Sequence, residues 1–276
     1  MKLRGILLAA ASMLLLPLVT GAQIAPANGA GVAAGHEHMR ALDVDALKQF
    51  LHVLGASDGV VGKRSVLYVP GVVLLIIAPN PNAPANTELG GSEGTSVDSI
   101  GFRVKNLQDT LKKLGDAGYK PLSGATAKHV FIMAPNKAKV ELVEDRHLAT
   151  PVATDAVVMK VPDVAAGAAW YEKWFGAKIV RKHGELYAEI PGMNIRFEKA
   201  EQPVTGTTGR AIDHIGFEVD NLEAFMKKLG DGGVKITRPY TTQVPADVIP
   251  TLRSLALIED PWGTSIELNE GFRGLK

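Results

Sequence analysis

The chain has 276 residues, of which 30 are lysine or arginine and 29 are aspartate or glutamate, so its formal net charge is +1. It contains no cysteine, which excludes disulfides, a thiol nucleophile and a thiolate metal site. Because the charges are balanced and no basic run stands out, nucleic acid is not an expected partner. The length suits two domains that can each bury a hydrophobic core.

The start of the chain predicts a secretory signal peptide over residues 1–22. A short basic stretch precedes the apolar residues 6–19, and small residues before Gln23 suit cleavage at that point. The apolar segment is short for a bilayer span and contains Pro17, although a retained membrane anchor is the alternative. We therefore expect a periplasmic or secreted protein without a membrane span after cleavage, beginning with a disordered leader over residues 23–35.

Two later segments are near-copies of each other. Residues 97–118 and 212–233 share "IGF", "NL" and "KKLGD" at identical spacing. In the later copy, the alternating stretch "IDHIGFEV" predicts a strand, and Leu222, Phe225 and Leu229 then recur at helical spacing. Three short strand candidates follow the helix in each copy. The repeated unit is therefore predicted to be one strand, one helix and three strands.

Two weaker copies alternate with the strong ones. "HEHMRALDVDALKQFLHVLGAS" begins the first unit, and "DAVVMKVPDV" with "AAGAAWYEKWFGAK" begins the third. The aromatic residues of the third unit's helix are expected to pack against a sheet rather than to stack on a ligand. The order of the four units predicts two domains of two neighbouring units each, over residues 36–147 and 155–273, linked by "HLATPVAT".

The motifs "WYEKWFGAK", "DHIGFEVDNLEAF" and "DPWGTSIEL" occur in an order that resembles the vicinal oxygen chelate superfamily. That superfamily includes glyoxalase I, the bleomycin-resistance proteins and the extradiol dioxygenases, and the resemblance covers nearly all of residues 36–273. It implies an α+β fold with four βαβββ modules, two in each domain, which form a half-open barrel. It also implies a small-molecule cleft that in many members holds a divalent metal, here Fe, Mn, Zn or Ni.

In the C-terminal domain, the resemblance implies metal ligands on the first and last strands of each module. His214 and Glu267 match two of these positions, and we assign Glu267 a catalytic role as well. Ala156 and Arg196 occupy the other two, so this domain keeps two ligands. An arginine there could neutralise a glutamate or bind a carboxylate, and it would disfavour a nearby cation. The alternative to a ligand role is that His214 is a surface residue and that Glu267 faces the solvent.

The N-terminal domain retains a different pair of matching positions. His36 and Glu141 stand at ligand positions, whereas Ser99 and Leu75 fill the other two. His38 lies on the same strand face as His36 and is a candidate for an extra ligand. On this alignment each domain therefore lacks a ligand. The alternative is that His36 and His38 bind no metal and are exposed near the start of the mature chain.

A long insertion, "ITRPYTTQVPADVIPTLRS", precedes one of the last strands and is either a lid over a site or a plain surface loop. It carries Arg238, Tyr240 and Arg253, which together with Arg196 are the candidates for lining a substrate pocket.

The leading hypothesis is an exported protein whose metal supports lyase, isomerase or dioxygenase chemistry on a small molecule with vicinal oxygens. The alternative is a metal-free small-ligand-binding protein of the bleomycin-resistance kind, which the missing ligand in each domain favours. A further alternative gives the N-terminal domain a purely structural role. The sequence is compatible with a monomer or a homodimer.

Overall fold

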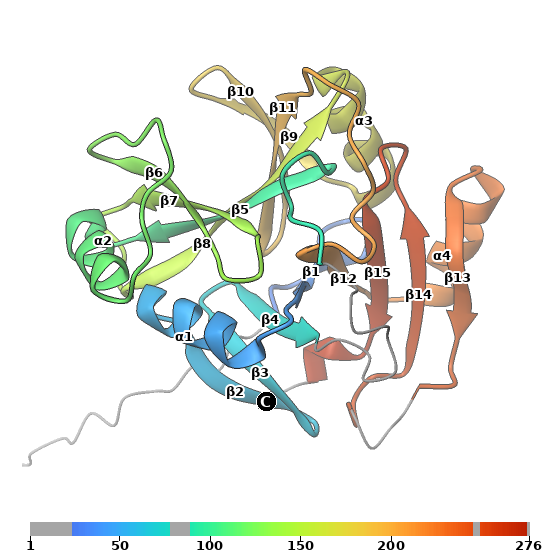
Figure 1. Ribbon diagram of the computed structural model, residues 1–276. Coiled ribbons are helices and arrows are strands. Elements are labelled where there is room, and N and C mark those ends of the chain that lie inside the picture. Colours follow the sequence, from blue (N-terminus) through green and yellow to red (C-terminus); the bar gives the residue numbers. More distant parts are fainter. Residues whose placement is uncertain (1–23, 78–88, 245–248, 275–276) are drawn as a thin grey trace, which may run out of the picture.

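The computed structural model describes residues 24–77, 89–244 and 249–274 and has the predicted α+β fold of four modules (Figure 1). The first module contains β1 (Val32–Arg40), α1 (Val44–Leu54), β2 (Ser57–Val61), β3 (Arg64–Val69) and β4 (Val72–Ile77). The second contains β5 (Val97–Val104), α2 (Leu107–Asp116), β6 (His129–Met133) and β7 (Lys139–Glu144). The third contains β8 (Val152–Val161), α3 (Val164–Phe175), β9 (Lys178–Lys182), β10 (Glu185–Ile190) and β11 (Met193–Lys199). The fourth contains β12 (Ile212–Val219), α4 (Leu222–Asp231), β13 (Lys235–Thr241), β14 (Ser254–Glu259) and β15 (Ser265–Glu270), followed by a 3₁₀ turn at Phe272–Gly274.

The second module has two strands after its helix, where three were expected. The segment between α2 and β6 contributes only an isolated bridge between Pro121 and Ile132. Proline has no N–H to donate to a strand ladder, and the neighbouring Gly124 has a positive φ of 84°. The segment therefore runs beside β6 without forming a strand, and the Leu122 backbone N–H donates to the Phe131 carbonyl oxygen at 2.7 Å.

The modules pair differently from the order of the chain. The strands of the first and fourth modules form one sheet in the order β13-β14-β15-β12-β1-β4-β3-β2, and those of the second and third form another in the order β6-β7-β5-β8-β11-β10-β9. In Figure 1 the blue first module accordingly lies beside the orange and red fourth module. The expectation that residues 36–147 and 155–273 would each form a barrel from neighbouring modules is therefore wrong.

Connector lengths give the physical reason for this pairing. β7 ends at Glu144 and β8 begins at Val152, so the predicted interdomain linker is a short connection within one sheet. The longer connections, from β4 to β5 and from β11 to β12, cross between the sheets instead. They meet through isolated bridges between Gly90 and Arg210 and between Thr95 and Thr205.

The segment that precedes the first predicted domain is part of the folded body from residue 24 onward. The side chain of Asn28 donates a hydrogen bond to the Phe175 carbonyl oxygen at 2.8 Å and accepts from the Val32 backbone N–H at 3.1 Å. Val32 is fully buried at the start of β1. Gly35 allows this strand to approach β12, since a Cβ there would lie 3.2 Å from the Gly216 carbonyl oxygen. The predicted disordered leader is therefore wrong for residues 24–35.

The signal peptide predicted for residues 1–22 lies outside the described residues. Among the helices that are described, none combines the length and the apolar character needed to cross a bilayer.

A hydrophobic core packs the helices against both sheets. As predicted, the aromatic residues of α3 belong to this core: Tyr171 and Phe175 are fully buried, and the ring of Phe175 lies 4.8 Å from that of Phe217 on β12. The Tyr171 hydroxyl donates to the Asp260 carboxylate at 3.0 Å, which joins the third module to the fourth. Burial raises the pKa of Asp260 to about 6, although backbone hydrogen bonds from Thr264 and Trp262 oppose the rise.

We expect the buried Asp260 to make the free energy of unfolding fall as the pH rises. Because its folded-state pKa lies above the ordinary value of 3.8, this stability is present below that value and is lost as the pH passes through about 6. A difference of this size corresponds to roughly 3 kcal/mol. Urea unfolding of the wild type and of Asp260→Asn at pH 4 and pH 7 measures it. The variant should lack this component, and equal pH dependence in the two proteins would contradict the prediction.

Candidate metal centre

Three neighbouring strands of the eight-stranded sheet bring four polar side chains together. His36 and His38 lie on β1, His214 on β12 and Glu267 on β15. β1 pairs antiparallel with β12, which places His38 opposite His214 and His36 opposite Gly216. β12 in turn pairs parallel with β15, which places Gly216 beside Glu267. The four side chains therefore reach one point through strand register alone.

Gly216 provides the space into which the His36 ring fits. A Cβ atom at this position would collide with the imidazole of His36. This glycine belongs to the "IGF" stretch shared by the two strong repeats. The stretch is predicted as a strand, and its glycine between bulky β-formers is the signal in the sequence for such a close approach.

The four residues offer ligand atoms that all lie within 4.8 Å of one another. His214 Nε2 is 3.1 Å from Glu267 Oε2, and His36 Nε2 is 3.8 Å from Glu267 Oε1. The rings of His38 and His214 are 3.9 Å apart between centroids. All three histidines are buried, whereas the Glu267 side chain is 16% exposed.

Most of these imidazole nitrogens have no hydrogen bond in the described part of the chain. This holds for both nitrogens of His36, both of His38 and Nε2 of His214, whose short approach to Glu267 lacks hydrogen-bond geometry. Buried polar atoms without partners are costly and uncommon in folded proteins. Converging imidazole nitrogens and a carboxylate are the ligands that Zn, Ni, Mn and Fe take. The residues therefore fit a divalent metal ion.

Two further side chains hold the candidate ligands in place. Asp213 Oδ1 lies 2.7 Å from His214 Nδ1, so the proton sits on Nδ1 and Nε2 faces the cluster. The other Asp213 oxygen accepts from the Gly209 backbone N–H at 2.7 Å. The Asn269 side chain donates to Glu267 Oε1 at 2.8 Å. Neither role is predicted from the sequence, although the "DH" pair is a visible signal for Asp213.

The pKa values of the cluster's members are shifted in different directions. Burial lowers the pKa of His36 to about 4 and that of His38 well below its ordinary value, so both are neutral at pH 7. Burial also opposes the charge of His214, but Asp213 and Glu267 outweigh it and raise the pKa of His214 to about 9. Burial disfavours the Glu267 charge, yet the histidines hold its pKa well below the ordinary range. Glu267 is therefore an ionised ligand.

A cavity of about 240 Å³ opens beside the cluster. His38 and Glu267 form its polar floor, and Arg64 and Arg238 are exposed at its rim. Its remaining lining is apolar and consists of Leu75, Ile249, Leu252, Leu255 and Phe272. Phe272 also stacks on His36 with ring centroids 5.0 Å apart, and Glu218 holds this segment by accepting from the Phe272 backbone N–H at 3.0 Å.

The structure brings three of the four predicted ligands together and separates the fourth. His36, His38, His214 and Glu267 form one cluster, so the division of ligands between two incomplete domain sites is wrong. The four residues meet because the first module pairs with the fourth in one sheet. Glu141 lies on β7 in the other sheet.

The four residues predicted to line a substrate pocket lie in different parts of the structure. Arg238 lines the cavity beside the cluster, whereas Arg196 lies in the other sheet. Tyr240 is half-buried and packs against the hydrophobic core. Arg253 is exposed and pairs with Glu270 at 3.1 Å.

The seven-stranded sheet contains a second cleft at the equivalent register, without histidines at the equivalent positions. Ser99, Ala156 and Val158 stand where the other sheet has His214, His36 and His38. Glu141 is the counterpart of Glu267, and the Arg196 guanidinium donates two hydrogen bonds of 3.0 Å to it. Arg196 thus pairs with Glu141, which corresponds to one of the two roles that the sequence left open for this arginine.

Comparison with known proteins agrees with this architecture. A family model for the glyoxalase, bleomycin resistance protein and dioxygenase superfamily matches residues 153–268. A V278E variant of glyoxalase I from Zea mays is 16% identical with a TM-score of 0.66, covering 88% of this chain and 94% of that chain. Residues 153–268 therefore match this superfamily, and the described chain shares the fold of glyoxalase I.

Other solved structures share this fold. Glyoxalase I from Zea mays is 16% identical with a TM-score of 0.64, covering 88% of this chain and 94% of that one. A proposed dioxygenase from Bacillus subtilis is 14% identical with a TM-score of 0.57, covering 86% of this chain and 85% of that one. Comparison with curated proteins gave no match. At these identities the likeness establishes the fold alone.

We expect Asp213→Asn to weaken divalent-metal binding by roughly 10- to 100-fold, because the variant loses the charged partner that orients His214. Zinc titration against a competing chelator measures the affinity. Asp58→Asn is the matched control, since Asp58 contacts His52 at 3.2 Å on the exposed surface. Wild-type affinity in Asp213→Asn would contradict the assigned role, and circular dichroism checks that both variants are folded.

Proposed function

We propose that this protein is a divalent-metal-dependent lyase or isomerase that acts on a small anionic molecule with two neighbouring oxygens. The observation that carries the proposal is the convergence of three buried imidazoles and one carboxylate at the floor of a cavity. Four protein ligands leave fewer open positions than the two-histidine, one-carboxylate set of iron oxygenases, which must admit both O₂ and substrate. This favours Lewis-acid chemistry over dioxygenation.

Glu267 is the residue that we propose for proton transfer. It is the one carboxylate among the described residues that line this cavity, and Asn269 fixes one of its oxygens. Its position at the cavity floor places an ionised carboxylate where it can accept a proton from a substrate carbon. A bound divalent ion would polarise the substrate's oxygens and make that proton more acidic. His36 and His38, neutral at pH 7, would hold the ion together with His214.

The rim of the cavity supports an anionic substrate. Arg64 and Arg238 both line it, and neither has an ion-pair partner among the described residues. A guanidinium is suited to binding a carboxylate in a bidentate manner. The apolar wall between the rim and the metal ligands would contact a short hydrocarbon body. The substrate is therefore proposed to present its oxygens to the metal ion and a carboxylate to the rim.

Export is a further part of the proposal, supported by the signal-peptide pattern over residues 1–22. Mass spectrometry of the protein recovered from expressing bacteria tests it. A mature chain beginning at Gln23 in the periplasm or medium supports export. Retention of the full-length chain in the cytoplasm overturns it.

Metal content is the decisive measurement. The mature protein, purified without chelators, is expected to hold about one divalent ion per chain. His36→Ala, His214→Ala and Glu267→Ala should each lose it, because each removes a ligand from a small set. His52→Ala is the matched control, since His52 is exposed on α1. Failure of the wild type to take up Fe, Mn, Zn or Ni would overturn the proposal and favour the metal-free binding alternative.

The rim arginines are expected to determine affinity for anions. With zinc-loaded protein, binding of mandelate, which carries a carboxylate next to a hydroxyl, should weaken about tenfold in the Arg64→Gln, Arg238→Gln double variant. Arg146→Gln, at an exposed site outside the cavity, should leave the affinity unchanged. Calorimetry measures these affinities. Equal binding by the double variant would contradict the anion site, and substrate-dependent O₂ uptake by iron-loaded protein would indicate a dioxygenase instead.

A further inference from the structure

The C-terminal turn, residues 271–274, follows the last strand and covers one side chain of the metal centre. Its Phe272 is 1% exposed and lines the cavity beside the cluster. The Phe272 ring stacks on the His36 imidazole, with 5.0 Å between ring centroids and 22° between ring planes. A segment without any candidate ligand thus contacts one of the four candidate ligands.

His36 differs from His214 in what orients its ring. His214 has the Asp213 carboxylate at Nδ1, whereas neither nitrogen of His36 has a hydrogen bond among the described residues. In metal sites, the histidine nitrogen that does not bind the ion is usually held by a polar group, which fixes the ring. The orientation of His36 therefore depends on packing, and Phe272 is the ring stacked on it that is not itself a candidate ligand.

A buried carboxylate fixes the C-terminal turn to β12. Glu218 accepts backbone hydrogen bonds from Gly271 at 2.9 Å, from Phe272 at 3.0 Å and from Arg273 at 3.4 Å. Successive backbone N–H groups around one anion form a nest. Because a buried carboxylate without such donors is costly, Glu218 holds the turn at this place.

Three positions on one face of β12 serve the same part of the metal centre. His214, Gly216 and Glu218 alternate along the strand, so their side-chain positions share a face. His36 lies opposite Gly216 in the register with β1. This strand face therefore supplies one candidate ligand, the space for a second, and the anchor of the ring that contacts the second.

The seven-stranded sheet has neither the anchor nor the aromatic ring at the equivalent positions. Arg103 stands where β12 has Glu218, and arginine has no acceptor for backbone N–H groups. Arg146 follows β7 at the place where Phe272 follows β15. The anchor and the ring thus accompany the histidine cluster in one sheet, and all three are replaced at the matching positions of the other.

We propose that the C-terminal turn belongs to the metal centre, with Phe272 as a positioning residue that holds the His36 imidazole in the orientation that binds the ion. Glu218 acts one step further away, because it places Phe272. The inference rests on the proposed metal-dependent function. Holding the ring in advance lowers the cost of ordering it when the ion binds, which strengthens metal binding.

NMR of the metal-free protein tests the placement of the ring. An aromatic ring shifts the resonances of protons that lie over its face, so the His36 imidazole signals should move in Phe272→Leu, which keeps apolar bulk without a flat ring. Phe272→Tyr keeps the ring and should leave these signals close to those of the wild type. Glu218→Gln should move them in the same direction as Phe272→Leu, because the turn loses its charged anchor.

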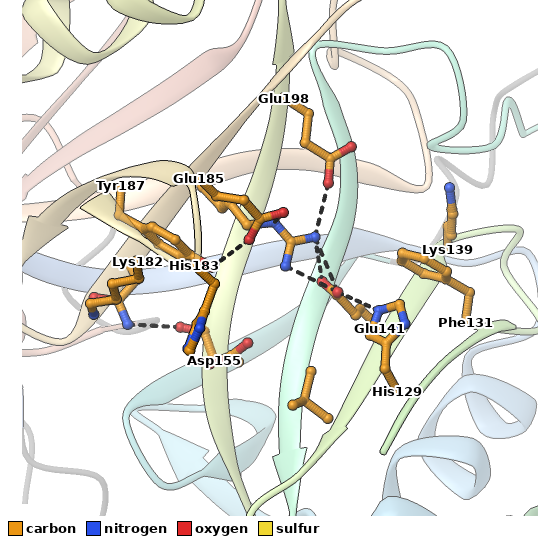
Figure 2. Close-up of a pocket in the computed structure, with 13 residues that line it drawn as sticks. His129, Phe131, Lys139, Glu141, Asp155, Lys182, His183, Glu185, Tyr187 and Glu198 are labelled. Carbon is orange, nitrogen blue, oxygen red and sulfur yellow. Dashed lines mark hydrogen bonds and ion pairs between the residues drawn. The ribbon is translucent and has the colours of Figure 1, made fainter. Parts of the chain in front are cut away.

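Zinc titration against a competing chelator tests the consequence for metal binding. We expect about tenfold weaker affinity in Phe272→Leu and in Glu218→Gln, and wild-type affinity in Phe272→Tyr. The visible absorption of the cobalt(II)-loaded protein, which reports ligand geometry, should change in the two weakened variants. Phe131→Leu is the matched control, because Phe131 contacts His129 with ring centroids 4.8 Å apart in the cleft of the other sheet (Figure 2).

The outcomes separate this inference from the proposed function. A wild type that takes up no divalent ion overturns both. A wild type that binds zinc, with equal affinity in Phe272→Leu, overturns this inference alone, and so does an equal loss in Phe131→Leu. If Phe272→Leu does not fold, Glu218→Gln decides: wild-type zinc affinity together with unmoved His36 signals in that variant overturns the inference.

Discussion

The antiparallel pairing of β1 with β12 is the contact on which the candidate metal centre depends. It joins strands that are some 180 residues apart in the chain and sets His38 directly opposite His214. A shift of one residue would turn every side chain of β1 to the other face of the sheet and separate the imidazoles. Gly216 and Gly35 make this pairing tight, because neither backbone presents a Cβ at the crossing point.

The two clefts have the same strand register, but the buried glutamate of each is paired with a different kind of side chain. In the eight-stranded sheet, Glu267 is surrounded by imidazoles that can exchange a proton for a metal ion. In the seven-stranded sheet, the equivalent Glu141 is neutralised by a permanent cation, Arg196. A buried carboxylate requires a partner in either case, since leaving it unpaired would cost several kcal/mol. The choice of partner decides whether an exchangeable position exists.

The alternation of strong and weak repeats corresponds to how the modules pair in the two sheets. Each sheet combines one strong module with one weak module, because the first pairs with the fourth and the second with the third. The weak first module supplies two histidines to the strong fourth module, while the weak third module supplies Arg196 to the strong second. Neither site can therefore be read from one module, or from two neighbouring modules, alone.

The sequence by itself determined the repeated strand–helix–strand unit, the α+β class, and the candidacy of His36, His214 and Glu267. The repeated unit follows from local periodicity, whereas the fold class and the candidate ligands follow from the resemblance to the vicinal oxygen chelate superfamily. Only the tertiary structure decided which candidates meet, because repeat alignment reveals which modules are alike but not which ones share a sheet. The orienting roles of Asp213 and Asn269, the space left by Gly216 and the pairing of Glu141 with Arg196 all follow from strand register. Register is set by contacts between residues far apart in the chain, which no local pattern encodes.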